Sequence, residues 1–381
     1  MSADQGVPAG AAGSASAGAP SAPGVGASPV PGVGAPIIAI ATPLPPHEVA
    51  RLRELEPSVV VRRIEGLVPE PAFVGDRLGA EAAAHWVDDP RLDDLFDGAS
   101  VVFGIPRDSP AVLARVLERH PSIRWVHGMT AGAGAVVREA HLDRPTLDRV
   151  VFTSSAGAHA GALAEFALFG LLAGAKQLPR LLADQRDGVW APRRMIGQLA
   201  DHRVVVVGLG SIGRRVATLL HAFGADVVGV HRNPERAAGA GLTAVVHPEH
   251  LAEALRGADG VVMCLPHTAA TEHLLDADAL SGLAPGAVVV NVGRGATIDE
   301  GALIAALRTG QVGYAALDVF EVEPLPVASP LWAMPNVLVS PHTAALSAGE
   351  DRRIVERFMA NVERFLADEP LHQRVDTVEF Y

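Results

Sequence analysis

Cysteine is nearly absent from this sequence: Cys264 is the only one among 381 residues. A single cysteine cannot form an intramolecular disulfide, and it excludes a zinc site built from several cysteines. Basic residues are also outnumbered, with 31 Lys and Arg against 43 Asp and Glu and a formal net charge of −12. Proteins that bind nucleic acid or anionic membranes usually carry the opposite sign, so we expect neither partner.

Long apolar runs are missing as well. A membrane-spanning helix needs about 20 consecutive apolar residues, and the most apolar stretch, 161–175, contains Glu165 and precedes Lys176. Residues 1–36 are mostly Ala, Gly, Pro, Ser and Val, with Asp4 as their one charge. That composition cannot offset the entropy of ordering, so we expect a disordered tail. We also expect no signal peptide and a soluble, cytoplasmic protein.

The rest of the chain alternates short apolar runs with helical patterns. In the first part, strands are predicted at 36–41, 59–61, 99–104, 125–127 and 150–153, and helices at 47–55 and 109–119. In the second part, strands are predicted at 204–207, 226–230, 260–265, 287–292, 314–319 and 337–340, and helices at 212–223, 250–256 and 300–309. Such alternation is typical of βαβ units and parallel sheets. The predicted fold class is α/β, with doubly wound sheets.

A helix that is apolar nearly all round is predicted between these two parts. It runs from His159 to about Leu178, where Pro179 would end or kink it. A helix without a polar face must be buried, and we expect it to lie between two domains. A chain of this length is large enough for two domains.

The strongest local signal is a glycine-rich loop. Four valines lead into Gly208-Leu209-Gly210-Ser211-Ile212-Gly213, which has the spacing G-x-G-x-x-G and opens a predicted helix. In this context the motif indicates dinucleotide binding, with a purely structural turn as the alternative. Gly208 would allow the tight turn, Gly210 the approach of a pyrophosphate, and Gly213 close packing of helix on strand. The helix start at Ser211 and Ile212 would offer free N–H groups to the phosphates.

The end of the next strand bears on which dinucleotide binds. It reads His231-Arg232-Asn233, without the Asp or Glu that usually bonds the ribose 2′-hydroxyl of NAD. Arg232 and His231 are suited to hold a 2′-phosphate through charge-assisted hydrogen bonds. The alternative is that Arg232 is a solvated turn residue. The expected cofactor is therefore NAD(P)H, with a preference for NADPH.

Three further segments place polar residues after predicted strands: 285–295 with Arg294, 316–326 with Asp318 and Glu323, and 335–344 with His342. The start of the long helix adds a pattern of its own, formed by Gly157, His159, Ala164, Glu165 and Phe166. Together with the glycine loop, these motifs resemble the D-isomer-specific 2-hydroxyacid dehydrogenase family over about residues 37–370. The resemblance implies an enzyme that transfers hydride between NAD(P)H and C2 of a small 2-keto or 2-hydroxy acid, in the manner of glyoxylate/hydroxypyruvate reductases.

The resemblance also implies a catalytic role for three residues. Arg294 would hold the substrate carboxylate and carbonyl, a task that suits a planar guanidinium. His342 would be the general acid in ketone reduction and the base in alcohol oxidation. Glu323 would bond the other ring nitrogen of His342 and fix its orientation. Taken singly, these residues have ordinary alternatives: a surface charge, a turn residue and a solvated acidic loop.

Other contacts follow from the same resemblance. Asp318 would contact the nicotinamide amide, with a buried structural Asp as the alternative. The turn at 130–134 would present the backbone N–H groups of Ala131 and Gly132 to the substrate carboxylate, beside Arg294 and His342. Cys264 is expected to pack near the cofactor without chemistry, and no metal is required. The remaining expected cofactor contacts are Leu265, Pro266, Val292, Arg294 and His342.

The implied architecture has two Rossmann-like domains. An NAD(P)-binding Rossmann domain over 154–344 would be inserted into a flavodoxin-like substrate (catalytic) domain, formed by 37–153 and a C-terminal return at 345–381. The spacing of Ile354, Phe358, Val362 and Phe365 predicts a helix in that return. Family members are commonly dimers, so a homodimer is expected. Two alternative functions stay open: an NAD(H)-sensing, corepressor-like binding protein and a phosphoglycerate-dehydrogenase-like enzyme.

Overall fold

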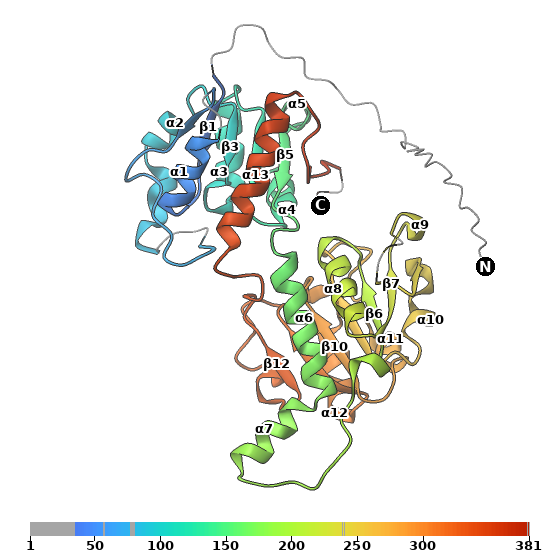
Figure 1. Cartoon of the computed structure of the whole chain (residues 1–381). Coiled ribbons are helices and arrows are strands. Elements are labelled where there is room, and N and C mark those ends of the chain that lie inside the picture. The colour runs from blue at the N-terminus through green and yellow to red at the C-terminus, as the bar shows by residue number, and fades with distance from the viewer. Residues whose placement is uncertain are drawn as a thin grey trace, which may run out of the picture.

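The structure is a computed structural model that describes residues 35–55, 58–76, 81–237, 239, 241–378 and 380, with only the backbone of 81–84. Positions 1–34 of the expected tail lie outside the described residues. Figure 1 shows two bodies, each built around a parallel sheet with helices on both faces. The chain leaves the first body through helix α6 (Ala160–Ala175) and returns to it in helix α13 (Glu350–Leu366). The predicted α/β class is confirmed.

The first sheet has five parallel strands in the order β2-β1-β3-β4-β5. This 2-1-3-4-5 order is that of flavodoxin-like folds, as expected. Helices α2, α3 and α4 pack on one face, and α1 and α13 pack on the other. The elements are β1 (Ile37–Ile40), α1 (Pro46–Glu54), β2 (Val60–Arg62), α2 (Arg91–Phe96), β3 (Val101–Phe103), α3 (Pro110–Arg119), β4 (Trp125–Gly128), α4 (Ala133–Glu139), α5 (Arg144–Arg149) and β5 (Val151–Ser154).

Local sequence explains where α3 begins and which face of α13 is buried. Ser109 caps α3 by accepting a hydrogen bond from the Val112 N–H at 3.4 Å, and Pro110 occupies the first turn. The helical spacing of Ile354, Phe358 and Val362 seats those three side chains in the core of the first body. The Phe358 ring stacks on Trp125 at a centroid distance of 4.8 Å, so α13 is an integral part of that core.

The second sheet has seven parallel strands in the order β12-β11-β10-β9-β6-β7-β8. Counted from β6, this is the 3-2-1-4-5-6 order of dinucleotide-binding folds with one strand added at the edge. Helices α6 and α8 cover one face, and α10, α11 and α12 cover the other. The strands are β6 (Arg203–Val207), β7 (Asp226–Val230), β8 (Ala244–Val246), β9 (Gly260–Met263), β10 (Ala287–Asn291), β11 (Val312–Leu317) and β12 (Val337–Val339). The helices are α7 (Leu178–Arg186), α8 (Ser211–Ala222), α9 (Pro234–Ala237), α10 (Leu251–Leu255), α11 (Ala277–Ser281) and α12 (Glu300–Thr309).

Two sequence-based expectations need correction here. Six strands were predicted for this sheet, and β8, a three-residue edge strand that is only partly buried, was not among them. A single helix was predicted up to about Leu178. In the structure α6 ends at Ala175, Gln177 adopts a left-handed φ of 54°, and Pro179 sits in the first turn of a separate helix, α7. Proline stopped the first helix and opened the second, because its fixed φ suits a helical N-terminus.

The position of α6 also differs from the prediction. Leu163, Ala167 and Leu171 pack on the second sheet beside α8, so α6 belongs to that body rather than separating the two. Its outer face leaves Phe169 47% exposed. Within the described residues, none of the helices is both long enough and apolar enough to span a membrane.

Candidate active site

The glycine loop joins β6 to α8 at the carboxyl edge of the second sheet. Gly208 has a φ of 97°, a conformation that side chains disfavour, and it makes the turn out of β6. A Cβ on Gly213 would collide with the carbonyl oxygen of Gly208, which shows how closely the helix packs on the loop. A Cβ on Gly210 would meet open space. Gly210 precedes α8, whose N-terminus carries no side-chain cap, so the N–H groups of Ser211 and Ile212 face outwards.

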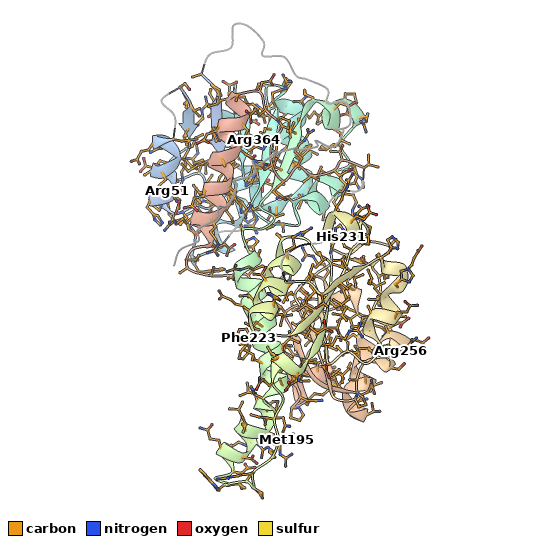
Figure 2. The ribbon with its side chains drawn as sticks, turned by 45° about the vertical axis from the view of Figure 1, so that its right-hand side comes forward. Arg51, Met195, Phe223, His231, Arg256 and Arg364 are labelled. Atoms are coloured by element: carbon orange, nitrogen blue, oxygen red, sulfur yellow. The ribbon has the colours of Figure 1, made fainter. Side chains whose placement is uncertain are left out.

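The turn after β7 lies beside this loop. The Gly208 N–H donates to the Val230 carbonyl at 3.1 Å, which ties the loop to the end of β7. The next residue is His231, whose Nδ1 accepts a hydrogen bond from the Asn233 N–H at 3.0 Å. Arg232 is exposed. Figure 2 places His231 at the end of the second body that faces the first body. The turn therefore presents basic groups, and no carboxylate, next to the glycine loop.

The segment after β9 fills the space between two loops. A Cβ on Gly208 would lie 2.8 Å from Leu265 Cδ2, and one on Gly293 would lie 2.6 Å from the Leu265 carbonyl oxygen. Leu265 thus contacts both the glycine loop and the segment that carries Arg294. Pro266 is exposed, whereas Val292 is buried in the core of the sheet. Burial raises the pKa of the Cys264 thiol to about 12, so the thiol stays protonated at neutral pH.

Arg294 follows β10 on a tightly held backbone. Its carbonyl oxygen accepts hydrogen bonds from Asn291 Nδ2 at 3.0 Å and Thr297 Oγ1 at 2.7 Å. Neither of these buried polar side chains was identified from the sequence. The Arg294 side chain is exposed, and its Nη1 donates to the Gly293 carbonyl at 2.7 Å. The backbone is fixed while the guanidinium reaches out of the sheet.

The Arg294 guanidinium reaches the turn of the first body. Its Nη2 lies 3.0 Å from the position that a Cβ on Gly132 would occupy. Ala131 is exposed and Gly132 half-buried, and together they lead into α4. The structure therefore brings three of the predicted substrate contacts together, although they come from different sheets: Ala131, Gly132 and Arg294.

Glu323 and His342 form a direct pair. Glu323 Oε2 lies 2.7 Å from His342 Nδ1, and Glu323 Oε1 accepts a hydrogen bond from the Phe320 N–H at 3.0 Å. Since a carboxylate only accepts, Nδ1 donates and Nε2 is the ring nitrogen left for a ligand. His342 has a left-handed φ of 56°, which is sparsely populated for a side-chain-bearing residue. Both side chains remain partly exposed, at 47% for His342 and 36% for Glu323.

Asp318 lies under this pair and is 1% exposed. Its Oδ1 accepts three hydrogen bonds: from Ser340 Oγ at 2.5 Å, from the Thr343 N–H at 2.9 Å and from the Ala344 N–H at 3.0 Å. These bonds flank His342 and stabilise its unusual backbone conformation. The structure thus gives Asp318 a clear structural function, and its predicted contact with the nicotinamide stays a prediction.

One basic residue near the glycine loop, Arg357, was not predicted from the sequence. A Cβ on Gly157 would lie 3.1 Å from Arg357 Nη2 and 3.3 Å from Ser211 Cβ. Helix α13 of the first body therefore brings Arg357 close to the N-terminus of α8. The amphipathic pattern of α13 predicts which of its residues are buried, but it contains no signal for this approach.

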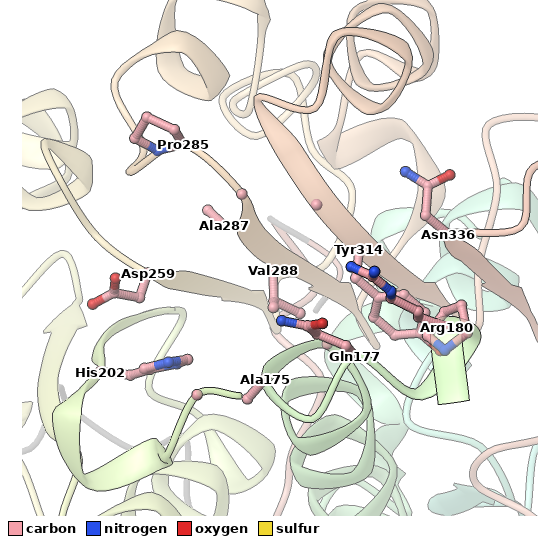
Figure 3. A pocket seen from close by; sticks show the side chains of 15 residues that line it. Ala175, Gln177, Arg180, His202, Asp259, Pro285, Ala287, Val288, Tyr314 and Asn336 are labelled. Atoms are coloured by element: carbon pink, nitrogen blue, oxygen red, sulfur yellow. The ribbon is translucent and has the colours of Figure 1, made fainter. Parts of the chain in front are cut away.

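A cavity of about 420 Å³ lies elsewhere in the second body. Figure 3 shows it between the α6–α7 junction, with Gln177 and Arg180, and the start of β10 at Ala287 and Val288. It therefore opens at the amino-terminal edge of the sheet, whereas ligands of open α/β sheets bind at the carboxyl edge. Across the described part of the chain, no group of three or more His, Cys, Asp or Glu is placed to hold a metal ion.

Comparison with known proteins agrees with this geometry. Residues 168–344 match the family described as D-isomer specific 2-hydroxyacid dehydrogenase, NAD binding domain. The chain is 34% identical to a glyoxylate reductase of Aeropyrum pernix, over 64% of this chain and 73% of that protein. A D-isomer specific 2-hydroxyacid dehydrogenase of Xanthobacter autotrophicus, solved with NADPH and MES, is 33% identical, with a TM-score of 0.71 over 92% of this chain and 100% of that one.

A longer relative matches as well. The chain is 34% identical to D-3-phosphoglycerate dehydrogenase of Mycobacterium tuberculosis over 77% of its own length. It spans only 54% of that protein, about half of its length.

Proposed function

The chain belongs to the D-isomer specific 2-hydroxyacid dehydrogenase family, and from that premise we propose that it is an NAD(P)-dependent oxidoreductase acting on a small 2-keto acid. The enzyme reduces the C2 carbonyl to a hydroxyl and catalyses the reverse oxidation. Its catalytic residues are Arg294, Glu323 and His342. One observation carries the proposal. Glu323 Oε2 lies 2.7 Å from His342 Nδ1, and this pair lies at the sheet edge that also bears the glycine loop.

Arg294 binds the substrate carboxylate. The guanidinium is always charged, and its parallel N–H groups match the two oxygens of a carboxylate. It extends from β10 towards Gly132, where the N–H groups of Ala131 and Gly132 meet the same carboxylate from the other side. A substrate held at this point is bound by both bodies, so a closer approach of the two bodies would exclude water from the reaction.

His342 moves the proton. In the reduction, its Nε2–H protonates the carbonyl oxygen as the carbonyl becomes a hydroxyl, and in the oxidation Nε2 takes that proton back. Glu323 accepts the Nδ1–H, which fixes the orientation of the ring. Hydride comes from the nicotinamide when the cofactor is bound. No metal takes part in this scheme.

The residues of the second body fit a dinucleotide. The open space at Gly210 and the uncapped N-terminus of α8 suit a pyrophosphate. Leu265, Pro266 and Val292 would contact the cofactor between the glycine loop and Arg294, and Asp318 would meet the nicotinamide amide. Arg232 and His231 would hold a 2′-phosphate, so the enzyme prefers NADPH. Its Xanthobacter relative was solved with NADPH, which supports that preference.

A steady-state panel tests this function. Glyoxylate, hydroxypyruvate, 3-phosphohydroxypyruvate and larger 2-keto acids are each assayed with NADPH and with NADH. We expect the highest kcat/KM with glyoxylate or hydroxypyruvate and NADPH. A clear preference for NADH would overturn the cofactor assignment, and a preference for the phosphorylated substrate would make the enzyme phosphoglycerate-dehydrogenase-like.

A second candidate function is an NAD(H)-sensing, corepressor-like binding protein. It is favoured only by the fact that such a protein can keep the same catalytic residue types. The same panel separates the two functions. Tight binding of NAD(P)H without turnover of any 2-keto acid would favour the sensor and refute the enzyme.

We also propose a homodimer formed through an arm at residues 178–197. Figures 1 and 2 show this arm projecting away from the second sheet, and Figure 2 labels Met195 on its returning segment. Its apolar side chains are unusually exposed, with Trp190 at 100% and Met195 at 93%. Apolar groups gathered in this way favour burial against a partner, here a second copy of the chain. Light scattering should show a dimer for the wild type and for Trp332→Glu, and a monomer for Trp190→Glu. A monomeric wild type would contradict the proposal.

A further inference from the structure

A buried network of hydrogen-bonded side chains lies beneath the 128–132 turn, which we assign to substrate binding. Trp125 Nε1 donates to Thr153 Oγ1 at 2.8 Å, and Thr153 Oγ1 lies 2.8 Å from His127 Nδ1. His127 Nε2 lies 3.0 Å from Ser155 Oγ, which donates to the Gly128 carbonyl at 3.0 Å. His127, Thr153 and Ser155 are at most 1% exposed. None of these side chains takes part in the proposed chemistry.

The donor and the acceptor of every hydrogen bond in this network can be assigned. The Gly128 carbonyl can only accept, so the Ser155 hydroxyl hydrogen points to it and Ser155 Oγ must accept from His127 Nε2–H. Burial lowers the pKa of His127 to about 3, so the ring is neutral and Nδ1 accepts from Thr153. Thr153 in turn accepts from Trp125. The tautomer of His127 follows from the network.

Ser155 holds the turn at two points. Besides the bond to Gly128, its backbone N–H donates to the Thr130 carbonyl at 3.3 Å. The Thr130 carbonyl and the Ala131 N–H belong to one planar trans peptide, in which the two groups point in opposite directions. Fixing the Thr130 carbonyl towards Ser155 therefore points the Ala131 N–H away from the core. This N–H is one of the two that we assign to the substrate carboxylate.

The rings that contact His127 belong to aromatic side chains. Its ring stacks on Phe103 at 5.7 Å with an interplanar angle of 8°, and it contacts Phe358 and Trp125. None of these neighbours titrates near neutral pH. A polar ring buried among aromatic side chains must find partners for both nitrogens, so an apolar side chain would be the simpler choice for packing alone. What the imidazole adds is a donor aimed at Ser155.

We propose that His127 and Ser155 are positioning residues for substrate binding. They hold the 128–132 turn so that its backbone N–H groups face the carboxylate of the 2-keto acid, opposite Arg294. The role rests on the proposed function, because it needs that turn to meet the substrate. The two residues do not touch the substrate, and they act through the peptide groups of the turn.

Two variants of the same network provide a matched test. Ser155→Ala removes the hydroxyl that bonds the turn, whereas Thr153→Val removes a hydroxyl on the opposite side of His127, away from the turn. Both leave one ring nitrogen of His127 without a partner, so thermal denaturation should show similar losses of stability. Ser155→Ala should raise KM for the keto acid about tenfold and leave KM for NADPH unchanged. Thr153→Val should leave both KM values within about twofold of wild type.

His127→Gln and His127→Phe extend the test to the ring. A Gln amide can donate to Ser155 and accept from Thr153, so it should keep KM for the keto acid near the wild-type value, whereas Phe should raise it. If Ser155→Ala does not fold, Ser155→Cys, with its poorer donor, replaces it. Binding of oxalate, an unreactive carboxylate, to each enzyme with NADPH gives a readout that does not depend on turnover.

Equal KM values for wild type and Ser155→Ala would overturn the positioning role, and so would equal effects of Ser155→Ala and Thr153→Val. A wild type without turnover would instead refute the proposed function. In that case, weaker oxalate binding by Ser155→Ala than by Thr153→Val would still support the positioning role. A wild type that binds no oxalate would refute both.

Discussion

One buried histidine, His127, should make a large contribution to the loss of stability of the first body in acid. His127 is completely buried, and burial lowers its pKa from the ordinary 6.5 to about 3. In the unfolded chain the same ring takes up a proton below pH 6.5, whereas the folded protein keeps it neutral down to about pH 3. The neutral ring therefore contributes its full stability above pH 6.5, and that stability is lost as the pH falls towards 3.

The size of this loss follows from the shift. Each pH unit below 6.5 costs about 1.4 kcal/mol for one group that protonates only in the unfolded state. Between pH 7.5 and pH 4.5 the loss due to His127 is about 3 kcal/mol. That is a substantial part of the net stability of a domain, which is roughly 5–15 kcal/mol.

Urea unfolding at pH 7.5 and 4.5 measures the effect, followed by tryptophan fluorescence, to which the buried Trp86 and Trp125 of the first body contribute. Other groups also respond to acid, so the informative quantity is a difference between enzymes. His127→Gln cannot titrate, and its loss between the two pH values should be smaller than that of wild type by about 3 kcal/mol. His141→Asn replaces an exposed histidine of the same body at a left-handed φ of 47°, which Asn tolerates, and serves as the control.

Equal acid losses for wild type and His127→Gln would refute the reasoning, because they would mean that the folded protein accommodates a charged ring at this position. A loss that changed as much in His141→Asn as in His127→Gln would also contradict it, since burial would then not be the cause.

Three further predictions concern the site. Arg294→Ala removes charge-assisted bonds worth about 2 kcal/mol, so steady-state kinetics should show KM for the keto acid rising roughly thirtyfold while KM for NADPH stays unchanged. Glu323→Gln keeps the size of the side chain and loses its charge, and kcat should fall about tenfold while fluorescence titration shows unchanged NADPH affinity. Arg232→Ser should lower kcat/KM about tenfold with NADPH and leave the value with NADH unaltered; equal losses with both cofactors would exclude a contact to the 2′-phosphate.

Much of the fold and part of the site could be predicted from local sequence. Buried parallel strands are continuous apolar runs, so β6 and β10 were visible as runs of valine. The glycine loop was recognisable because its geometry requires glycine: the turn at Gly208 and the helix contact at Gly213 tolerate no side chain. The polar residues after β10, β11 and β12 were expected at the carboxyl edge because parallel strands share that edge.

What could not be predicted depends on contacts between distant segments. The approach of Arg294 to Gly132 was expected only from the family resemblance, and nothing in the sequence shows that α13 brings Arg357 towards Ser211. His127 looked like one more residue of a strand, and only the register of β4 on β5 sets its ring beside Thr153. The edge strand β8 was missed because three half-buried residues form too short a pattern.

The central claim is that His342 transfers the proton in a reduction of 2-keto acids by NADPH. The most direct measurement compares wild type and His342→Ala for the loss of NADPH absorbance on addition of glyoxylate, with NADPH affinity measured for both. We predict that kcat falls by about 10²–10⁴-fold while the affinity for NADPH is unchanged. Turnover by His342→Ala near the wild-type rate would contradict the account.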